Sequence, residues 1–360
     1  MRIFILLILF VMSSFAQGYS KPDIERMIAK MVILGFNGEN VSKNSQIYKD
    51  IEAGLGGVIL FDKDPNDKNK VKNIRNKEQL KKLNQDLQAI SKQKLLISID
   101  QEGGVVQRLK TDMGFVNTLK ASEIAQKAEE FAKNSYQAMA KDLKDVGINV
   151  DFAPVVDLAL NKNNKVIVTR GRSFGESSSE VTKYASIFVD ELKKQNVISV
   201  LKHFPGHGSS LADSHLGFVD ITKTWTKKEL EPYKYFINNN KVDMIMTAHV
   251  FNENLDKNYP ATLSYNVNTK LLREQLKYDG VLITDDLQMS AISKHYDLKT
   301  TLRLSINSGV NLLLFANQLA KPVTLKEIVD TVYSEILSEN ISLEKIIESN
   351  KKIDKLLNNI

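Results

Sequence analysis

The sequence of 360 residues contains no cysteine. This absence excludes disulfide bonds, thiolate nucleophiles, cysteine-ligated zinc and a lipid anchor attached through cysteine. Long apolar runs are also scarce, and the run near the start, Ile3–Met12, is shorter than the roughly 20 residues that a membrane helix needs. Later apolar runs are shorter still, so we expect no stable membrane span.

The first residues have the pattern of a secretory signal peptide. Arg2 precedes the apolar run, and Ser14 and Ala16 give the run a small-x-small exit. We predict that residues 1–16 are a signal peptide, cleaved after Ala16, which exports the protein across the inner membrane to the periplasm. Residues 21–360 contain no linker rich in proline and glycine, and we predict that they form one domain.

The composition is that of a soluble globular protein, with 42% hydrophobic and 26% charged residues and a net charge of +6. Lysines are scattered along helix-like segments such as Lys63–Lys82. This distribution favours a solvated surface over a nucleic-acid site. We therefore expect no nucleic-acid partner, and we expect a monomer.

Eight short apolar runs alternate with longer amphipathic segments. Such runs are typical of strands that are buried on both faces of a parallel sheet. The predicted strands are Met31–Phe36, Gly57–Phe61, Leu95–Asp100, Asn149–Ala153, Ile198–His203, Met244–His249, Val281–Asp285 and Val310–Phe315.

The segments between the predicted strands have helical periodicity. Two begin with capping-box patterns, Ser177-x-x-Glu180 and Thr226-x-x-Glu229. Alternating strands and helices predict an α/β fold, a single (β/α)8 TIM-type barrel with no second catalytic domain. An open doubly wound sheet is the alternative, but no glycine fingerprint follows the first strand. The predicted helices are Ile47–Leu55, Lys77–Ile90, Ser122–Val146, Ser178–Lys194, Lys227–Asn238, Thr269–Lys277 and Leu298–Asn307, with two more after Val323.

Titratable residues follow directly after several predicted strands, where the active sites of such barrels lie. Four of the five histidines also fall between positions 203 and 249, which favours a working site over isolated structural histidines. The residues at this rim include Asp100, Glu102, Asp151, Asp157, His203, His249, Asp285 and Asp286.

Two chemistries could use such a rim. Metal-assisted hydrolysis by a barrel amidohydrolase usually draws ligands from a His-x-His pair on the first strand, but Met31–Phe36 carries no ligand. The second chemistry is nucleophilic and acid–base catalysis at a glycosidic bond, which requires no metal and no cofactor.

The segment Lys202–Gly208, Lys-His-Phe-Pro-Gly-His-Gly, is followed by Asp213-Ser214-His215. Proline and glycine allow a tight turn at the mouth of the barrel. Asp213 and His215 are two residues apart, so the carboxylate can reach the imidazole. Such a partner fixes the tautomer of a histidine and raises its pKa toward that of a general acid.

A second segment ends a predicted strand with two aspartates, Asp285 and Asp286. An aspartate that closes a buried strand directs its carboxylate into the barrel mouth, where it can attack an anomeric carbon. Its neighbour points elsewhere and could cap the next helix. Periodicity does not decide which of the two aspartates attacks.

These segments together resemble glycoside hydrolase family 3, in its β-N-acetylglucosaminidase branch. The similarity covers nearly the whole chain after the signal peptide. The loop with its Asp-Ser-His is the most specific part. The other matching segments are 56–61, 100–108, 151–157, 172–175, 246–249 and 260–264.

The resemblance implies a retaining β-N-acetylhexosaminidase that acts on a carbohydrate substrate, a glycan or muropeptide that contains N-acetylglucosamine. It implies Asp285 as nucleophile and His215, assisted by Asp213, as acid and base. The sugar-binding positions that match are Asp100, Arg108, Arg172, Lys202 and His203, with His249 and Met289 as pocket-lining positions.

Three alternatives stay open. A phosphorylase on the same fold is compatible with a histidine donor, because an anionic base would repel phosphate. A metal-dependent amidohydrolase and a non-catalytic wall-binding barrel are the other two. The export signal favours action in the periplasm or at the cell wall, in peptidoglycan turnover, over cytoplasmic recycling. The polar insert Asp62–Lys77 has no functional interpretation from the sequence.

Overall fold

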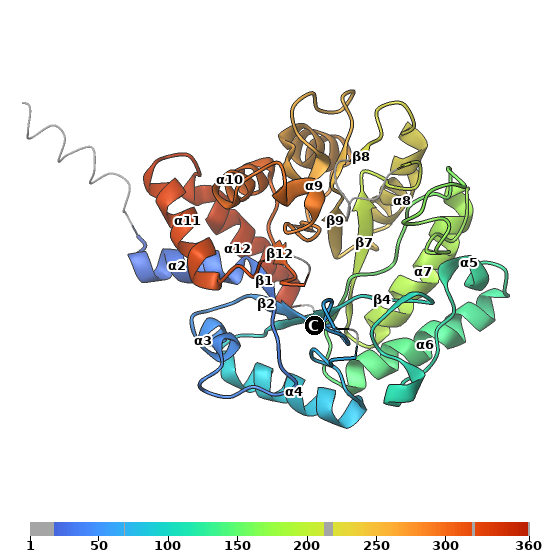
Figure 1. Cartoon of the computed structure of the whole chain (residues 1–360). Helices are drawn as coiled ribbons and strands as arrows, with labels where there is room; N and C mark the ends of the chain where they lie inside the picture. The colour runs from blue at the N-terminus through green and yellow to red at the C-terminus, as the bar shows by residue number, and fades with distance from the viewer. Residues whose placement is uncertain (1–17, 68, 212–218, 319–320, 359–360) are drawn as a thin grey trace, which may run out of the picture.

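The computed structural model describes residues 18–67, 69–211, 219–318 and 321–358 (Figure 1). The predicted signal peptide, residues 1–16, lies outside the described residues. Within the described ranges, no helix has both the length and the apolar character needed to cross a membrane.

Eight parallel strands form the central sheet, in the order β11-β9-β7-β6-β3-β2-β1-β12. An isolated parallel bridge between Ile283 and Leu312 joins the two ends of this sheet, which makes it a barrel. All eight strands fall within or overlap the predicted apolar runs, so the predicted (β/α)8 barrel is confirmed. The strands are β1 Val32–Gly35, β2 Gly57–Ile59, β3 Leu96–Ile99, β6 Val150–Asp151, β7 Ile198–Phe204, β9 Met244–Thr247, β11 Val281–Ile283 and β12 Leu313–Phe315.

Helices surround the strands (Figure 1), and their apolar faces are buried against the barrel. Helix α2, which precedes the first strand and packs against α11 and α12, was not among the predicted helices. The described helices are α2 Lys21–Lys30, α3 Gln46–Glu52, α4 Lys77–Ile90, α5 Ala121–Ile124, α6 Glu129–Asp145, α7 Ser178–Lys194, α8 Glu231–Asn238, η4 Asn266–Gln275, α9 Ser290–Ser293, α10 Leu298–Ser308, α11 Leu325–Leu337 and α12 Leu343–Leu357.

The predicted helix Ser122–Val146 is two helices, α5 and α6. The chain between them is extended at Ala128. The Tyr184 hydroxyl of α7 donates to the carbonyl of Lys127 over 2.8 Å, which satisfies a carbonyl that a continuous helix would use internally. This long-range contact supports the break, and periodicity alone does not reveal it.

The two predicted capping boxes have different outcomes. Ser177 accepts a hydrogen bond from the backbone N–H of Glu180, as the pattern predicts. Thr226 makes no such side-chain cap, and a short 3-10 helix, η2 Lys227–Leu230, follows it. The prediction at Thr226 was wrong because the carboxylate of Glu229 is bonded elsewhere, to Gly208 and Ser209.

Candidate active site

A cavity of about 590 Å³ lies at the carboxyl ends of the barrel strands. Its wall includes Ile59 of β2, Met246 of β9 and Leu314 of β12, together with polar residues from the loops that follow the strands. Seven of the predicted site residues line this one cavity: Asp100, Arg108, Arg172, Lys202, His203, Asp285 and Met289.

Lys202, on β7, lies between two carboxylates. Its Nζ is 2.9 Å from Oδ1 of Asp100 and 2.7 Å from Oε1 of Glu102. Burial alone would lower the pKa of Lys202, but the two carboxylates raise it above its ordinary value. Burial would likewise raise the pKa of Asp100, yet Lys202 and Arg108 hold it below its usual range. Both groups are therefore charged at neutral pH.

Arg172 binds the same acidic cluster from another loop. Its Nε and Nη2 donate to the two carboxylate oxygens of Glu102 over 2.8 and 2.7 Å. This bidentate geometry fixes the guanidinium plane more tightly than a single contact. Burial alone would raise the pKa of Glu102, but Arg172 and Lys202 lower it strongly. The result is a rigid set of charges beside the cavity.

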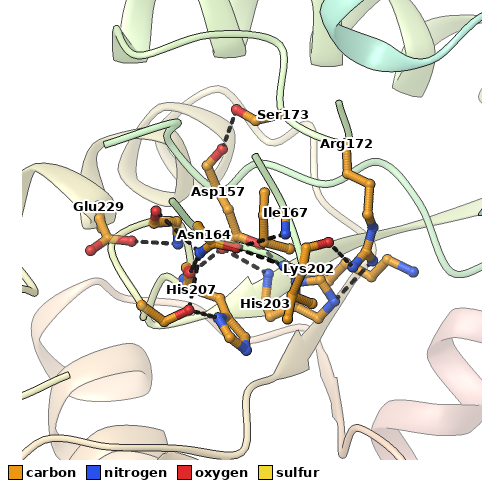
Figure 2. A network of polar contacts seen from close by, with 12 residues as sticks. Asp157, Asn164, Ile167, Arg172, Ser173, Lys202, His203, His207 and Glu229 are labelled. Atoms are coloured by element: carbon orange, nitrogen blue, oxygen red, sulfur yellow. Dashed lines mark hydrogen bonds and ion pairs between the residues drawn. The ribbon is translucent and has the colours of Figure 1, made fainter. Parts of the chain in front are cut away.

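His203 is held by a buried carboxylate. Its Nδ1 lies 2.7 Å from Oδ2 of Asp157, and its Nε2 lies 3.5 Å from Nη2 of Arg172 (Figure 2). Burial would raise the pKa of Asp157, but the neighbouring His203 lowers it. Since Nδ1 faces the carboxylate, Asp157 fixes the orientation of the imidazole at the cavity wall.

His207 also lines the cavity. Its backbone N–H donates to Oδ1 of Asp157 over 2.8 Å, and its Nδ1 lies 2.7 Å from the hydroxyl of Ser210. Asn164 donates to the carbonyl of His207 over 2.8 Å (Figure 2). Burial and the nearby His203 lower the pKa of His207 to about 4, so its imidazole is neutral at pH 7.

Asp285 and Asp286 occupy different environments at the end of β11. The carboxylate of Asp286 is buried, and its Oδ1 accepts from the backbone N–H groups of Gln288 and Ala316, each over 3.1 Å. Asp285 is partly exposed and lies on the cavity wall. Both aspartates line the cavity, and Asp286 also organises the local backbone, whereas Asp285 is the more exposed of the two.

His249 is buried, and it is absent from the residues that line the cavity. Its Nε2 lies 2.8 Å from the carbonyl oxygen of Asp286, and its Nδ1 lies 2.8 Å from the hydroxyl of Thr262. This position is behind the two aspartates, where His249 supports the backbone that carries Asp285.

The predicted acid and base, His215 and Asp213, lie outside the described residues. Their role therefore stays a prediction. The described chain resumes at Val219, and Ser210, near the other end of this gap, is bonded to His207 close to the cavity.

Sequence reasoning noticed Glu102 and Asp157 at the rim but gave neither a role in the site. The structure makes both of them central, because each binds a predicted sugar-binding residue directly. The available signal was their position immediately after a predicted strand. Their partners are 70 and 46 residues away along the chain, so spacing could not reveal the pairs.

The polar insert forms part of the cavity wall. Its residues Asp62, Lys63, Asp64 and Pro65 line the cavity. An antiparallel bridge between Lys63 and Val71 closes the insert on itself. Lys110 binds Asp62, which ties the insert to the loop after β3. The insert is therefore held in place by these contacts, and it forms the part of the cavity wall next to Arg108.

Among residues 18–67, 69–211, 219–318 and 321–358, no group of three or more histidine and acidic side chains has a geometry that could hold a metal ion. The charges at the cavity are instead arranged as pairs of acidic and basic side chains. Such a site can bind a polar, uncharged ligand through many hydrogen bonds.

Comparisons with known proteins identify relatives of this chain. The chain is 32% identical to "Beta-hexosaminidase A" of Pseudoalteromonas piscicida over an alignment of 327 residues. This alignment covers 84% of this chain and 53% of that protein. The chain is also 33% identical to "Beta-hexosaminidase" of Haemophilus influenzae over an alignment of 270 residues. This alignment covers 73% of this chain and 73% of that protein. The chain therefore spans about half the length of the first relative and about three quarters of the second.

Solved structures of similar proteins have the same fold. A glycoside hydrolase family 3 β-N-acetylglucosaminidase from Paenibacillus superposes with a TM-score of 0.82 at 32% identity, over 93% of this chain and 62% of that one. A β-N-acetylhexosaminidase from Beutenbergia cavernae superposes with a TM-score of 0.83 over 93% of this chain and 98% of that one, and at 22% identity it shows the fold alone.

The family model for the glycosyl hydrolase family 3 N-terminal domain matches residues 24–356, which is nearly the whole described chain. The barrel, the charged cavity at its carboxyl end and the relatives above are all consistent with that match. The resemblance read from the motifs is confirmed. This chain belongs to glycoside hydrolase family 3 and carries the family's N-terminal domain.

Proposed function

We propose that this protein is a retaining β-N-acetylhexosaminidase that hydrolyses terminal β-linked N-acetylglucosamine. The observation that carries the proposal is the cavity itself, which Asp285 lines together with six other residues predicted to bind the sugar. The names of the two relatives, both β-hexosaminidases, support the same substrate class.

In this mechanism the sugar is held by the paired charges. Asp100, Arg108, Arg172, Lys202 and His203 lie on the cavity wall with fixed orientations, so each offers a donor or acceptor in a preset position. Hydroxyl and amide groups of a sugar need both kinds of partner. Met289, which also lines the cavity, contributes an apolar surface to it.

Asp285 then attacks the anomeric carbon through one carboxylate oxygen, and the bond from that carbon to the leaving oxygen breaks. His215, held by Asp213, gives its proton to the leaving oxygen. In the second step the neutral His215 takes a proton from water, the water oxygen attacks the same carbon, and the ester bond to Asp285 breaks. Two inversions at one carbon retain its configuration.

We further propose that the enzyme acts outside the cytoplasm on fragments derived from peptidoglycan. The support is the signal-peptide pattern of residues 1–16. A chain without cysteine has no thiol to oxidise in that compartment.

The test compares an aryl β-N-acetylglucosaminide with the matching aryl β-glucoside, with and without inorganic phosphate. We expect turnover of the first substrate, little turnover of the second, and free N-acetylglucosamine as the product in both buffers. Sugar 1-phosphate as the main product would replace the hydrolase with a phosphorylase. Loss of activity after exhaustive chelation would point instead to a metal-dependent enzyme.

A further inference from the structure

Glu229, in the 3-10 helix η2, is a buried acid that the proposed mechanism does not use. Only 1% of its surface is exposed. Its Oε2 accepts from the backbone N–H of Gly208 over 3.0 Å, and its Oε1 accepts from the hydroxyl of Ser209 over 2.6 Å (Figure 2). Both donors belong to the segment His203–Ser210, which comprises the end of β7 and the loop after it and directly precedes residues 211–218.

The loop is packed closely onto this acid. Gly206 has a φ of +121°, and a Cβ added to it would lie 2.5 Å from the Cβ of Glu229. A side chain at position 206 would therefore push the loop away from Glu229. The indole N–H of Trp225 also donates to the carbonyl of Pro205 over 3.0 Å, so two residues near η2 hold the loop.

A second buried carboxylate holds the same loop from the opposite side. Oδ1 of Asp157 accepts from the backbone N–H groups of His203 and His207 over 3.3 and 2.8 Å. The loop is therefore held by two carboxylates, that of Asp157 from the chain after β6 and that of Glu229 from η2 (Figure 2). Both histidines of the loop line the cavity.

The two carboxylates differ in what balances their charge. Asp157 faces the imidazole of His203, whereas no basic side chain pairs with Glu229 in the part of the chain that the structure describes. The other titratable groups that interact with Glu229 are Asp157 and Tyr233 of α8. Burial, with repulsion from Asp157, raises the pKa of Glu229 to about 7.

We propose that Glu229 is a positioning residue for the catalytic histidine loop. As a carboxylate it accepts from Gly208 and Ser209, and through them it holds His207 and Ser210, which shortly precede Asp213 and His215 in the sequence. The inference rests on the proposed function, because it assigns proton donation to that segment. Protonation of Glu229 converts an acceptor into a donor, and the N–H of Gly208 cannot accept.

The first test is Glu229→Gln in the full chain, assayed on two aryl N-acetylglucosaminides, one with an acidic leaving group and one with a poor leaving group. Misplacing a catalytic group can cost about 100-fold in rate. We expect kcat/KM for the poor leaving group to fall by about 10- to 100-fold and that for the acidic leaving group by less than about 3-fold, because only the former depends on proton donation.

The pH profile separates positioning from general stability. We expect the wild-type profile for the poor leaving group to include an ionisation near pH 7 that Glu229→Gln removes. The matched control is Glu191→Gln, another buried glutamate, which lies on α7 and pairs with Lys194. The control is expected to keep both the leaving-group dependence and the pH profile of the wild type.

A second measurement does not depend on turnover. The amide resonance of Gly208, followed by NMR, should titrate with a midpoint near pH 7 in the wild type and stay constant in Glu229→Gln. Equal losses on both substrates together with an unchanged profile, or an amide that does not titrate in the wild type, would overturn the inference. If the wild type turns over neither substrate, the proposed function fails, and the amide titration still decides whether Glu229 holds the loop.

Discussion

The backbone N–H of Asp286 donates to Oδ1 of Asp285 over 2.8 Å, so the second aspartate of the pair orients the carboxylate of the first. Asp286 itself is bound by the amides of Gln288 and Ala316. A hydrogen bond to a carboxylate stabilises its charged form. Both aspartates line the cavity, but Asp286 is the one bound by two backbone amides, which supports the proposal that Asp285 is the attacking group.

Asp285→Asn is expected to lower kcat on the order of 10⁶-fold, as the loss of a catalytic nucleophile does in other enzymes. The amide cannot form the ester. Asp286→Asn is the matched control, because its carbonyl can still accept from the same two amides, and we expect a loss of less than about 100-fold. Initial rates on an aryl N-acetylglucosaminide measure both variants, and a larger loss for Asp286→Asn would reverse the assignment.

His215→Ala is expected to slow substrates with poor leaving groups far more than activated aryl substrates. Proton donation contributes roughly 10²- to 10⁴-fold when the leaving group is a weak acid, and little when it leaves unaided. A plot of kcat/KM against leaving-group pKa should become steeper in the variant. Parallel plots for wild type and variant would show that His215 binds the sugar rather than donating a proton.

Glu102→Gln removes the carboxylate that Arg172 and Lys202 share, and it leaves two buried cations with less compensation. Breaking a buried ion pair from one side costs about 3 kcal/mol of unfolding free energy. Urea denaturation measures this loss. Glu129→Gln, at the exposed ion pair with Lys183, is the control and should cost less than about 1 kcal/mol. Similar losses in the two variants would contradict the structural role given to Glu102.

His207 and Glu229 make opposite contributions to stability as pH changes. The pKa of His207 falls from 6.5 to about 4 on folding, so the unfolded chain binds more protons and stability rises between pH 4 and pH 6.5. The pKa of Glu229 rises from 4.5 to about 7, so the folded chain binds more protons and stability falls between pH 4.5 and pH 7.

The two slopes partly cancel in the wild type, and single variants should separate them. In Glu229→Gln, unfolding free energy should increase more steeply from pH 4 to pH 6.5 than in the wild type. In His207→Asn it should decrease more steeply from pH 4.5 to pH 7. Denaturation curves across this pH range provide the measurement, and two variants with the pH dependence of the wild type would refute both shifts.

Much of the barrel was predictable because its strands are buried on both faces and read as apolar runs. The same alternation placed Asp100, Lys202 and Asp285 at strand ends, and the structure brings all three to one cavity. Local pattern did not determine features that depend on distant contacts. The break before α6 is supported by Tyr184, which lies 57 residues from its partner Lys127.

In the site, too, local sequence pattern predicted some features, and contacts between distant residues determined others. Glu229 matches a capping-box position in the sequence, but its carboxylate binds Gly208 and Ser209, about 20 residues away. His249 ends a strand like the other rim residues, yet it lies behind the cavity wall, against Asp286. A strand end fixes where a residue sits along the barrel, and only the packing around it decides whether the side chain reaches the cavity.

The most direct test of the central claim is covalent trapping. The wild-type enzyme is incubated with a fluorinated N-acetylglucosamine analogue that forms the glycosyl-enzyme but hydrolyses slowly, and the labelled peptide is sequenced by mass spectrometry. We predict one sugar per protein, attached to Asp285, with no labelling of Asp285→Asn. A label on Asp286 or on another residue, or turnover of the substrate without any trapped intermediate, would contradict the account.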